Sequence, residues 1–445
     1  MTRHAAELVC DADAQAAVRT SPTALNVAVV GAGIGGLAAA IRLRQAGHRV
    51  TILEQTSRLL PVGAGIQLAP NATRILHSLG VLDALAPRAV AAQVSVRRRW
   101  QDGRMLGEFP LGKAVVDRFG SAYVHAHRGD LHGALTATAV DAGRPGQPVS
   151  IQLGSAVAGV DQPARGPAVL TTSDGRRVAA DAVIGADGIH SRVREVIGSP
   201  DVVRFSGDVA YRSLVPVESV LKQPSLAALT ERPALTIWLG PGRHLVHYLV
   251  SGGEYLNVVL CAPGDDKATE SWSAFGDVAD MVQALDGWDE RAVRIASSAA
   301  RVHTWGLYDR EPLEDWTAGR VALLGDACHP MLPYQAQGAA QALEDAAALG
   351  DVLEGIDTDA VAEALSSYSA RRQPRAAAVQ LASRHNRELF HLPDGPGQAL
   401  RDEQLGEMSG DFDSYAWIWS SSAPSEAGRS ERQESRGTER RGARR

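Results

Sequence analysis

The stretch Leu25–Glu54, LNVAVVGAGIGGLAAAIRLRQAGHRVTILE, decides the fold of this 445-residue chain. It begins with an apolar run of β type, Val27–Val30, breaks into glycines, and continues as an Ala- and Leu-rich run to Ala46. Gly47 is expected to end this helix, and a second β run, Val50–Leu53, follows it. The pattern predicts a β-α-β unit with a G-x-G-x-x-G sequence at its first turn.

The turn carries four glycines that are candidates for cofactor binding: Gly31, Gly33, Gly35 and Gly36. The first, second and fourth have the spacing of a dinucleotide-binding turn. Gly31 permits the tight turn, Gly33 lets the backbone approach the pyrophosphate, and Gly36 allows close packing of helix on strand. The phosphates would lie at the helix N-terminus, where N–H groups and the helix dipole favour an anion. Glu54 ends the second strand, where it can accept a hydrogen bond from an adenosine ribose and repel a 2′-phosphate. These residues predict FAD or NAD rather than NADP.

Composition excludes several classes of protein. The chain has 45% hydrophobic residues, enough for a large core and two domains, and a net charge of −6. Without a broad basic field, no nucleic-acid partner is expected. The three cysteines, Cys10, Cys261 and Cys328, lie far apart without a CxxC, so they predict neither a disulfide framework nor a metal site. A reduced, cytoplasmic location fits this cysteine usage best.

The two ends of the chain are expected to be poorly ordered. Residues 1–24 contain acidic residues and no long apolar stretch, so they do not resemble a secretory signal. Residues 421–445 are rich in Ser, Gly, Glu and Arg, which predicts a disordered tail. No apolar run is long enough to cross a membrane, so no membrane partner is expected. The sequence leaves a monomer and a homodimer open.

A second domain, built on a sheet, is indicated by the strand patterns. Val94–Arg99 and Arg104–Phe109 flank a Gly turn and predict a hairpin that interrupts the α/β pattern. In residues 205–262, apolar and polar residues alternate between Gly and Pro turns, which predicts an antiparallel sheet. Ser273–Ala299 returns to helical spacing, and Trp305–Trp316 is expected to be a loop.

Two further apolar strands end in acidic motifs. The first leads into Gly185-Ala186-Asp187-Gly188 and the second into Gly325-Asp326-Ala327-Cys328-His329-Pro330. Ligands of parallel sheets bind at the carboxyl ends of strands, where both acids would lie. The second motif is followed by a helix expected over Gln341–Leu353, whose N-terminus could stabilise a negative charge on a bound ring. Taken alone, Asp187 is better explained as a helix cap.

Several side chains invite a functional interpretation. Arg128 stands in the first turn of a predicted helix, where a positive charge is unfavourable, so another role is expected to retain it. His244 and Tyr248 share one face of a predicted strand, whereas His247 points to the other.

Other side chains are expected to be structural. Cys328 and His329 are adjacent, so they are expected to point apart rather than form a nucleophile pair. The aromatic residues near the C-terminus, Tyr415, Trp417 and Trp419, predict a packed helix end rather than a site.

Together the three strand-end motifs resemble those of FAD-dependent single-component aromatic hydroxylases. Gly63–Gln67, His127–Leu131 and Ala336–Gly338 look like the salicylate, 3-hydroxybenzoate and 6-hydroxynicotinate hydroxylases within that family. The resemblance covers about residues 25–420 and neither tail. It implies an α/β fold like that of para-hydroxybenzoate hydroxylase, in which an antiparallel β-sheet substrate domain is inserted into a Rossmann-type FAD-binding domain.

The resemblance also implies domain boundaries. The FAD-binding domain would comprise residues 25–95, 121–204 and 300–370, and the substrate domain residues 96–120 and 205–299. Residues 371–420 would form a C-terminal helical segment between these domains and the tail.

The resemblance implies a role for each residue that matches a family motif. Glu54 would hold the adenosine ribose, Arg128 would contact the flavin, and Asp326 would bind the ribityl chain. Asp187 would support the pyrophosphate region and the approach of the nicotinamide donor. Backbone N–H groups at Gly338–Ala339 would face the flavin N1–C2 carbonyl and stabilise the reduced anion.

The reaction implied by the resemblance uses FAD, O2 and NADH or NADPH on a salicylate- or hydroxybenzoate-like carboxylate. Oxygen adds to reduced FAD, and an activated ring attacks the resulting C4a-hydroperoxide. In related hydroxylases a His and a Tyr at the spacing of His244 and Tyr248 line the substrate pocket, so these two are the predicted catalytic residues. Gln67, Arg212 and Tyr334 complete the predicted pocket, and Arg212 could bind a carboxylate or form a structural ion pair.

Three alternatives remain open at this point. Gln67 stands where hydroxynicotinate hydroxylases have a His, which favours a benzoate over a pyridine. A hydroxylase or epoxidase of a urate-like, heteroaromatic or larger natural-product substrate would carry the same cofactor motifs. A flavin-binding protein without turnover is the non-enzyme alternative. An NAD-dependent dehydrogenase is disfavoured because it would not need Asp326 and the helix start after it.

No second G-x-G-x-x-G exists, so the nicotinamide donor should bind transiently at the flavin face.

Overall fold

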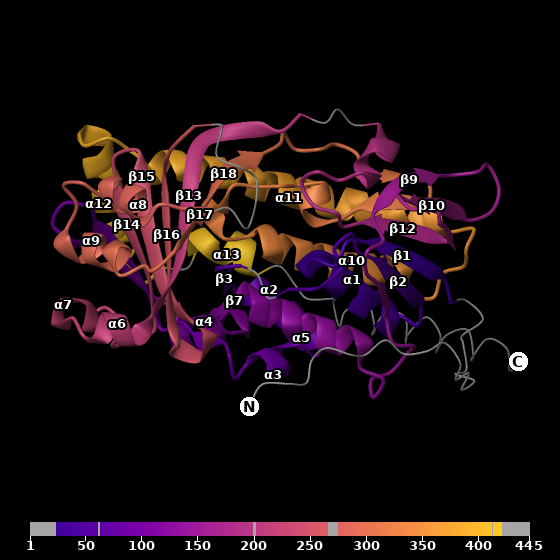
Figure 1. Ribbon diagram of the computed structural model, residues 1–445, viewed down its shortest axis with the longest axis horizontal. Helices are drawn as coiled ribbons and strands as arrows, with labels where there is room; N and C mark the ends of the chain where they lie inside the picture. Colours follow the sequence, from indigo (N-terminus) through magenta and orange to yellow (C-terminus); the bar gives the residue numbers. More distant parts are fainter. Residues whose placement is uncertain (1–23, 61–62, 199–201, 266–274, 412, 421–445) are drawn as a thin grey trace, which may run out of the picture.

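The computed structural model describes residues 24–60, 63–198, 202–265, 275–411 and 413–420. The predicted leader, apart from residue 24, and the predicted tail lie outside these residues. Figure 1 shows an elongated molecule with a parallel sheet toward one end and a larger sheet toward the other. Helices α10 and α11 run between the two sheets.

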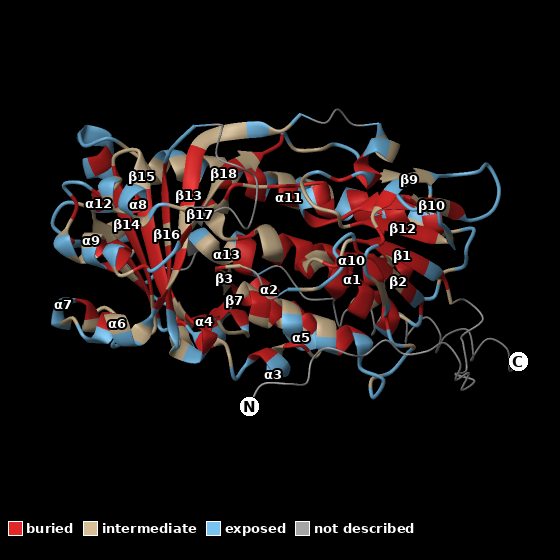
Figure 2. Ribbon diagram, in the orientation of Figure 1, coloured by how far each residue is buried: buried red, intermediate tan, exposed pale blue. Residues whose placement is uncertain are grey.

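The cofactor end is built on a six-stranded sheet in the order β19-β20-β12-β1-β2-β8. Every neighbouring pair is parallel except β19–β20. The strands are β1 (Asn26–Val30), β2 (Arg49–Leu53), β8 (Ser150–Gln152), β12 (Ala182–Gly185), β19 (Thr317–Ala318) and β20 (Val321–Leu323). Buried aliphatic residues fill its strands and the facing helices (Figure 2). The sheet therefore has the two-sided burial expected of a parallel sheet.

The predicted β-α-β unit is confirmed. Helix α1 (Ile34–Gln45) begins directly after Gly33, and Gly47 follows its end with a φ of +91°. A Cβ on Gly36 would lie 2.1 Å from the carbonyl oxygen of Gly31, so only glycine lets α1 approach the turn this closely. The close approach buries Leu37 completely against the sheet.

Other helices at this end follow the sequence patterns. Helix α2 (Pro70–Ser78) starts at the predicted Pro70, and α10 (Gly338–Leu353) starts earlier than the predicted Gln341. The remaining elements of this end are α3 (Leu82–Leu85), α5 (Arg128–Val140), β3 (Gly65–Leu68), β4 (Val90–Ala91), β7 (Val124–His127), β9 (Val157–Asp161), β10 (Ala168–Thr172), β11 (Arg177–Ala180) and the 3-10 helix η1 (Val193–Ile197).

The other end is an eight-stranded sheet in the order β17-β18-β13-β16-β15-β14-β5-β6. Its strands are β5 (Val94–Arg99), β6 (Met105–Pro110), β13 (Arg204–Pro216), β14 (Ala234–Gly240), β15 (Arg243–Val250), β16 (Tyr255–Pro263), β17 (Phe275–Gly276) and β18 (Val302–Asp309). The predicted hairpin and antiparallel sheet are present, with one correction. Strands β5 and β14 pair in parallel. They are far apart in the sequence and no hairpin joins them, so their pairing does not have to be antiparallel.

The interpretation of Trp305–Trp316 as a loop is wrong for its first part. Val302–Asp309 forms β18, which pairs antiparallel with β13. Its alternation is hard to detect in the sequence because His303, Thr304 and Trp305 are all only half-buried. The predicted helical stretch before it contains two short helices, α8 (Val278–Gln283) and α9 (Glu290–Ser297).

Helix α11 (Val361–Phe390) connects the two ends of the molecule. It leads to α12 (Pro396–Glu407) and α13 (Asp413–Trp419), so most of the C-terminal segment is helical in the structure. Shorter helices lie around the larger sheet: α4 (Gly112–Phe119), α6 (Val217–Leu221) and α7 (Pro224–Ala227). In the described part of the chain, no helix has the length and hydropathy needed to span a bilayer.

Candidate active site

The three strand-end motifs lie side by side. Strands β20, β12 and β1 are neighbours and parallel, so their carboxyl ends share one edge of the sheet. Backbone hydrogen bonds continue past the strands, from Ala186 N–H to the Val30 carbonyl and from Leu324 N–H to the Gly185 carbonyl, each 2.8 Å. One site is therefore built from segments far apart in the sequence, as expected for ligands of parallel sheets.

The glycine turn leaves space where a phosphate group would approach. A Cβ on Gly31, which has a φ of +102°, would lie 2.5 Å from the Ala186 carbonyl oxygen, and one on Gly35 would lie 2.5 Å from Leu324 Cδ2. In contrast, a Cβ on Gly33 would meet nothing within 4 Å. Gly33 is also the residue that precedes α1, with no side-chain cap. The turn thus fits a pyrophosphate at the N-terminus of α1.

Glu54 fixes this turn to the end of β2. Its carboxylate accepts hydrogen bonds from Ala32 N–H at 2.7 Å and Thr56 N–H at 2.8 Å. On the other side, His132 Nε2–H donates to the Ala32 carbonyl at 2.7 Å. Each carboxylate oxygen has a further lone pair, so Glu54 can hold the turn and still accept a ribose hydroxyl. No sequence motif predicts the contact made by His132.

Asp187 acts as a cap in the structure. Its carboxylate accepts hydrogen bonds from the Ser191 hydroxyl at 2.6 Å, Arg192 N–H at 2.7 Å and Val193 N–H at 3.1 Å. Burial raises the pKa of Asp187, and these hydrogen bonds oppose that rise. The residue thus orders the turn that packs against Gly31, while its predicted role toward the nicotinamide donor stays a prediction.

Arg128 and Asp326 place opposite charges near each other. The stem of Arg128 packs against Gly63, where a Cβ would lie 3.0 Å from Arg128 Cβ. Burial lowers the pKa of Arg128, and the charge of Asp326 counteracts this shift. Burial likewise raises the pKa of Asp326, and His329 and Arg128 counteract it. Asp326 is an exposed residue, so a ligand can reach it, as hydrogen bonds to ribityl hydroxyls would require.

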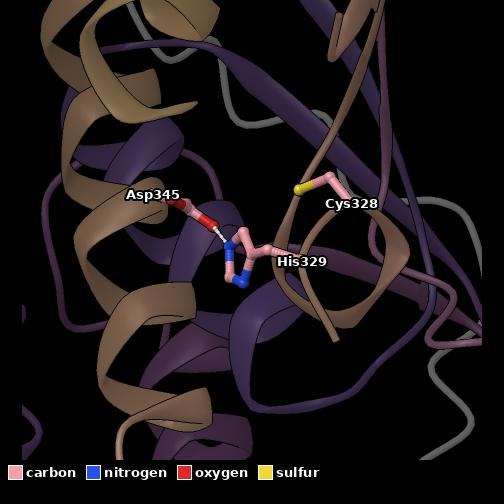
Figure 3. A group of neighbouring side chains, drawn as sticks. All are labelled: Cys328, His329 and Asp345. Atoms are coloured by element: carbon pink, nitrogen blue, oxygen red, sulfur yellow. Dashed lines mark hydrogen bonds and ion pairs between the residues drawn. The ribbon is translucent and has the colours of Figure 1, made fainter. Parts of the chain in front are cut away.

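Asp345 is held in a buried ion-pair network, of which Figure 3 shows the contact with His329. Its carboxylate accepts hydrogen bonds from His329 Nε2 at 2.6 Å and Arg372 Nε at 2.7 Å. Burial alone would raise the pKa of Asp345, but these two partners hold it below its ordinary value.

Cys328 lies beside this network, in surroundings that favour neither a nucleophile nor a metal ligand. The ligand atoms of Cys328, His329 and Asp345 lie within 4.8 Å of one another, but Arg372 already neutralises the carboxylate. Burial raises the pKa of the Cys328 thiol well above its ordinary value, so the thiol stays protonated.

The N-terminus of α10 faces the same region. Gln337 precedes the helix without a side-chain cap, and neither Gly338 nor Ala339 N–H has a hydrogen-bond acceptor within the described residues. Asn71 Nδ2 holds Gln337 in place by donating to its Oε1 at 2.9 Å. The residue before the helix is thus anchored by a hydrogen bond, and the helix has N–H groups to offer, which fits the predicted position opposite a flavin carbonyl.

A cavity of about 290 Å³ lies between the eight-stranded sheet and helices α11–α13. One face is formed by β5, β14 and β15, and another by the loop 333–337 that leads into α10. Its polar lining residues include Gln67, Ser95, Arg97, Tyr123, His244, Tyr334, Asn386 and Arg401. Most other lining residues are aliphatic or aromatic, so the cavity suits a small ring with a few polar groups.

The predicted pocket residues divide into two groups. Gln67, Tyr334 and His244 line the cavity. Tyr248 shares the face of His244, as predicted, but lies behind the lining, where its ring packs 4.4 Å from that of His125. Arg212 is also outside the lining, with its guanidinium 4.1 Å above the ring of Trp305.

His244 belongs to a buried polar group that the sequence did not reveal. Its Nδ1 lies 2.9 Å from Nε2 of His391, which comes from the end of α11. Burial, the neighbouring His391 and the charge of Arg97 lower the pKa of His244 well below its ordinary value. His391 Nδ1 in turn lies 3.8 Å from Asp208, which is also bound by Arg387 and Tyr334.

The C-terminal aromatic residues are part of the site, contrary to the prediction. Tyr415, Trp417 and Trp419 of α13 all line the cavity. The rings of Tyr415 and Trp419 stack at 4.6 Å, and Trp419 also contacts Phe119 at 5.5 Å. The prediction of a packed helix end is therefore incomplete, because this packed helix closes one side of the cavity.

Comparison with known proteins agrees with this geometry. The family described as "FAD binding domain" matches residues 24–383. The 3-amino-4-hydroxybenzoate 2-monooxygenase of Streptomyces cremeus is 40% identical over 90% of this chain and 96% of its own length. The 3-hydroxybenzoate 6-hydroxylase 1 of Aquipseudomonas alcaligenes is 36% identical over 88% of this chain and 96% of its own.

Solved structures show the same fold. A salicylate hydroxylase substrate complex superposes with a TM-score of 0.75 at 27% identity, covering 91% of this chain and 97% of that one. Klebsiella pneumoniae HpxO in complex with FAD and uric acid gives 0.77 at 25% identity, covering 89% and 96%. FAD is therefore the dinucleotide of this site, which settles the choice between FAD and NAD.

Asp326→Ala should weaken FAD binding by about 10- to 100-fold, because a hydrogen bond to a charged group contributes about 1.5–3 kcal/mol. Titration of the FAD-free protein with FAD, followed by flavin fluorescence, measures the change. Asp315→Ala removes an exposed carboxylate from the same end of the molecule and should leave the affinity unchanged. An Asp326→Ala protein that retains FAD like the unmodified chain would contradict the assignment.

Acid should destabilise the protein below about pH 6.5, the ordinary pKa of histidine. Burial lowers the pKa of both His125 and His247 to about 3 and that of His391 to about 4. Below about pH 6.5 the unfolded chain therefore binds protons that the folded chain does not. Each such histidine makes the free energy of unfolding fall by up to about 1.4 kcal/mol per pH unit.

Denaturant unfolding between about pH 6.5 and 5 in excess FAD measures this slope. His247→Leu should reduce the slope, whereas His77→Gln, on the exposed end of α2, should not. An equal slope in both variants would show that His247 does not contribute.

Proposed function

This chain belongs to the FAD-binding family of flavin-dependent aromatic monooxygenases, and we propose that it hydroxylates a small hydroxylated aromatic carboxylate. The observation that carries the proposal is the cavity beside the N-terminus of α10. It has room for about one substituted ring, its lining includes His244 and Arg97, and no Asp or Glu is among its described lining residues. An anionic aromatic substrate suits such a lining.

The relatives support this substrate class. The two curated relatives described above are named for hydroxybenzoate substrates, and a third, from Pseudomonas fluorescens, is named 6-hydroxynicotinate 3-monooxygenase. All three names describe a hydroxylated aromatic carboxylate. Gln67 lines the cavity. The family resemblance implies a histidine at this position in hydroxynicotinate hydroxylases, which favours a benzoate in this chain.

FAD, when bound, supplies the oxygen-activating redox chemistry of the reaction. The chain's own residues would position it: Gly33 and the start of α1 at the pyrophosphate, Glu54 at the ribose and Asp326 at the ribityl chain. The N–H groups of Gly338 and Ala339 would stabilise negative charge on the ring at the cavity. NADH or NADPH is the proposed electron donor, and the sequence favours neither.

His244 would accept a hydrogen bond, and then the proton, from the substrate hydroxyl. Its low pKa keeps the ring neutral at physiological pH, so it can act as an acceptor. Since Nδ1 faces His391, Nε2 is the atom left for the substrate. A proton taken up at Nε2 would be balanced by loss of the Nδ1 proton to His391, whose charge the nearby Asp208 would stabilise.

The proposed location is the cytoplasm, because Cys261 and Cys328 are free and buried in the described residues, as expected in a reducing compartment. A monomer or a homodimer is proposed, since the sequence leaves both open.

Hydroxybenzoates should accelerate NAD(P)H oxidation and give a product that contains one additional oxygen atom. The measurement combines anaerobic flavin reduction in a stopped-flow instrument with mass spectrometry of the products. The panel should include 3-amino-4-hydroxybenzoate, salicylate, 3-hydroxybenzoate, 6-hydroxynicotinate and uric acid. Hydroxylation of uric acid alone would favour the heteroaromatic alternative. A yellow protein that hydroxylates none of these compounds would contradict the proposal.

His244→Ala should lower hydroxylation by about 100-fold or more, because a positioned acid–base group contributes about 10²–10⁴. FAD affinity should not change, since His244 lies at the cavity and not at the glycine turn. Tyr248→Phe keeps the ring that packs behind the lining and should have a smaller effect. The role of His244 would be refuted by equal losses of FAD binding and hydroxylation.

A further inference from the structure

We propose that Arg97, assisted by Ser95, binds the carboxylate of the substrate and makes the cavity selective for aromatic acids over neutral phenols. The inference rests on the proposed function and adds the side chain that binds the substrate carboxylate. It assigns this role to β5, a strand in which the sequence had indicated only a hairpin.

Arg97 is a buried cation that faces the cavity. Its residue exposure is 8%, yet it is part of the cavity lining. It pairs across the sheet with Ile237 of β14, and Ser95 pairs in the same way with Leu235. Both partners on β14 also line the cavity, so Ser95 and Arg97 share its face of the sheet.

The guanidinium of Arg97 has N–H donors that are available to a ligand. Its Nη1 donates to Ser95 Oγ at 2.5 Å, and its Cζ lies 5.6 Å from the centre of the Phe109 ring. Among the described residues, no carboxylate forms an ion pair with it. No nitrogen of Arg97 is fully buried without a hydrogen-bond partner. Because Arg97 lines the cavity, the nitrogens not bound to Ser95 reach the cavity. A guanidinium has five N–H donors, and a buried cation without a counter-ion is costly unless an anion joins it.

The neighbouring arginines are already paired. Arg401, the other arginine of the lining, lies 2.8 Å from Asp402 and also donates to the Leu389 carbonyl at 2.8 Å. Arg98 points to the opposite face of the sheet, where it lies 5.7 Å from the ring of Trp238. Arg97 is thus the arginine of the described cavity lining that has donors available for a substrate, in a fork that matches a carboxylate.

The position of Arg97 connects binding to chemistry. Its charge lowers the pKa of His244, so the two groups lie close enough to interact. A carboxylate bound at Arg97 would neutralise this charge and make His244 a better proton acceptor. Substrates that lack the acid would leave His244 less basic. The same group would therefore influence both affinity and turnover.

The test compares 3-amino-4-hydroxybenzoate with its neutral amide, 3-amino-4-hydroxybenzamide. Dissociation constants come from perturbation of the flavin spectrum of the FAD-loaded protein. Arg97→Met keeps an unbranched apolar stem and removes the charged guanidinium. It should weaken binding of the acid by about 10- to 100-fold and leave the amide unchanged, because one charge-assisted contact is lost.

Arg104→Met is the matched control, since it removes an exposed arginine from the same hairpin. It should preserve the preference for the acid. Ser95→Ala provides a second variant in case Arg97→Met fails to fold, and it should weaken acid binding several-fold without affecting the amide. FAD affinity should be unchanged in the folded variants.

The outcomes separate this inference from the proposed function. If the unmodified protein hydroxylates benzoates but Arg97→Met and Ser95→Ala retain the full preference for the acid, the inference is wrong and the function stands. Equal losses for acid and amide would also overturn it, since they indicate a packing role. If the unmodified protein neither binds nor hydroxylates any benzoate, the proposed function fails first.

Discussion

The parallel pairing of β20, β12 and β1 is the constraint on which the site depends. It brings the glycine turn, Asp187 and Asp326 to one edge of the sheet, although the chain separates them widely. Close packing at Gly31 and Gly36 then fixes the start of α1, while Gly33 alone leaves room for a phosphate. A change in the register of any of these strands would move one of the three motifs away from the cofactor.

Buried ion pairs also hold the site in place. Glu344 and Asp345 on α10 are held by Arg372 and Arg375 on α11, so these two helices are joined through ion pairs in the interior. Leaving one partner of such a buried pair alone is strongly unfavourable, which keeps the two helices in a single arrangement. The loop that carries Tyr334 and Gln337 lies just before α10, so this network also positions one wall of the cavity.

The cofactor half of the site was predictable because its signals are local. A glycine at a fixed spacing, or an acid after an apolar strand, has a meaning that a short window of sequence contains. The substrate half depends on contacts between distant segments: His391 reaches His244 from α11, and α13 places Tyr415 and Trp419 over the cavity. Arg212 and Arg97 both stand on strands, and only the pairing of strands shows that Arg97 faces the cavity. The strand β18 was missed for a similar reason, since its partner β13 and not its own pattern stabilises it.

The most direct test is a crystal structure of the protein with FAD and 3-amino-4-hydroxybenzoate. The account predicts the pyrophosphate at Gly33 and the N-terminus of α1, and the flavin ring beside Gly338. The substrate ring should lie in the cavity with its carboxylate at Arg97 and its hydroxyl at His244. Density for FAD away from the three strand ends, or for a carboxylate away from Arg97 in a fully occupied cavity, would contradict it.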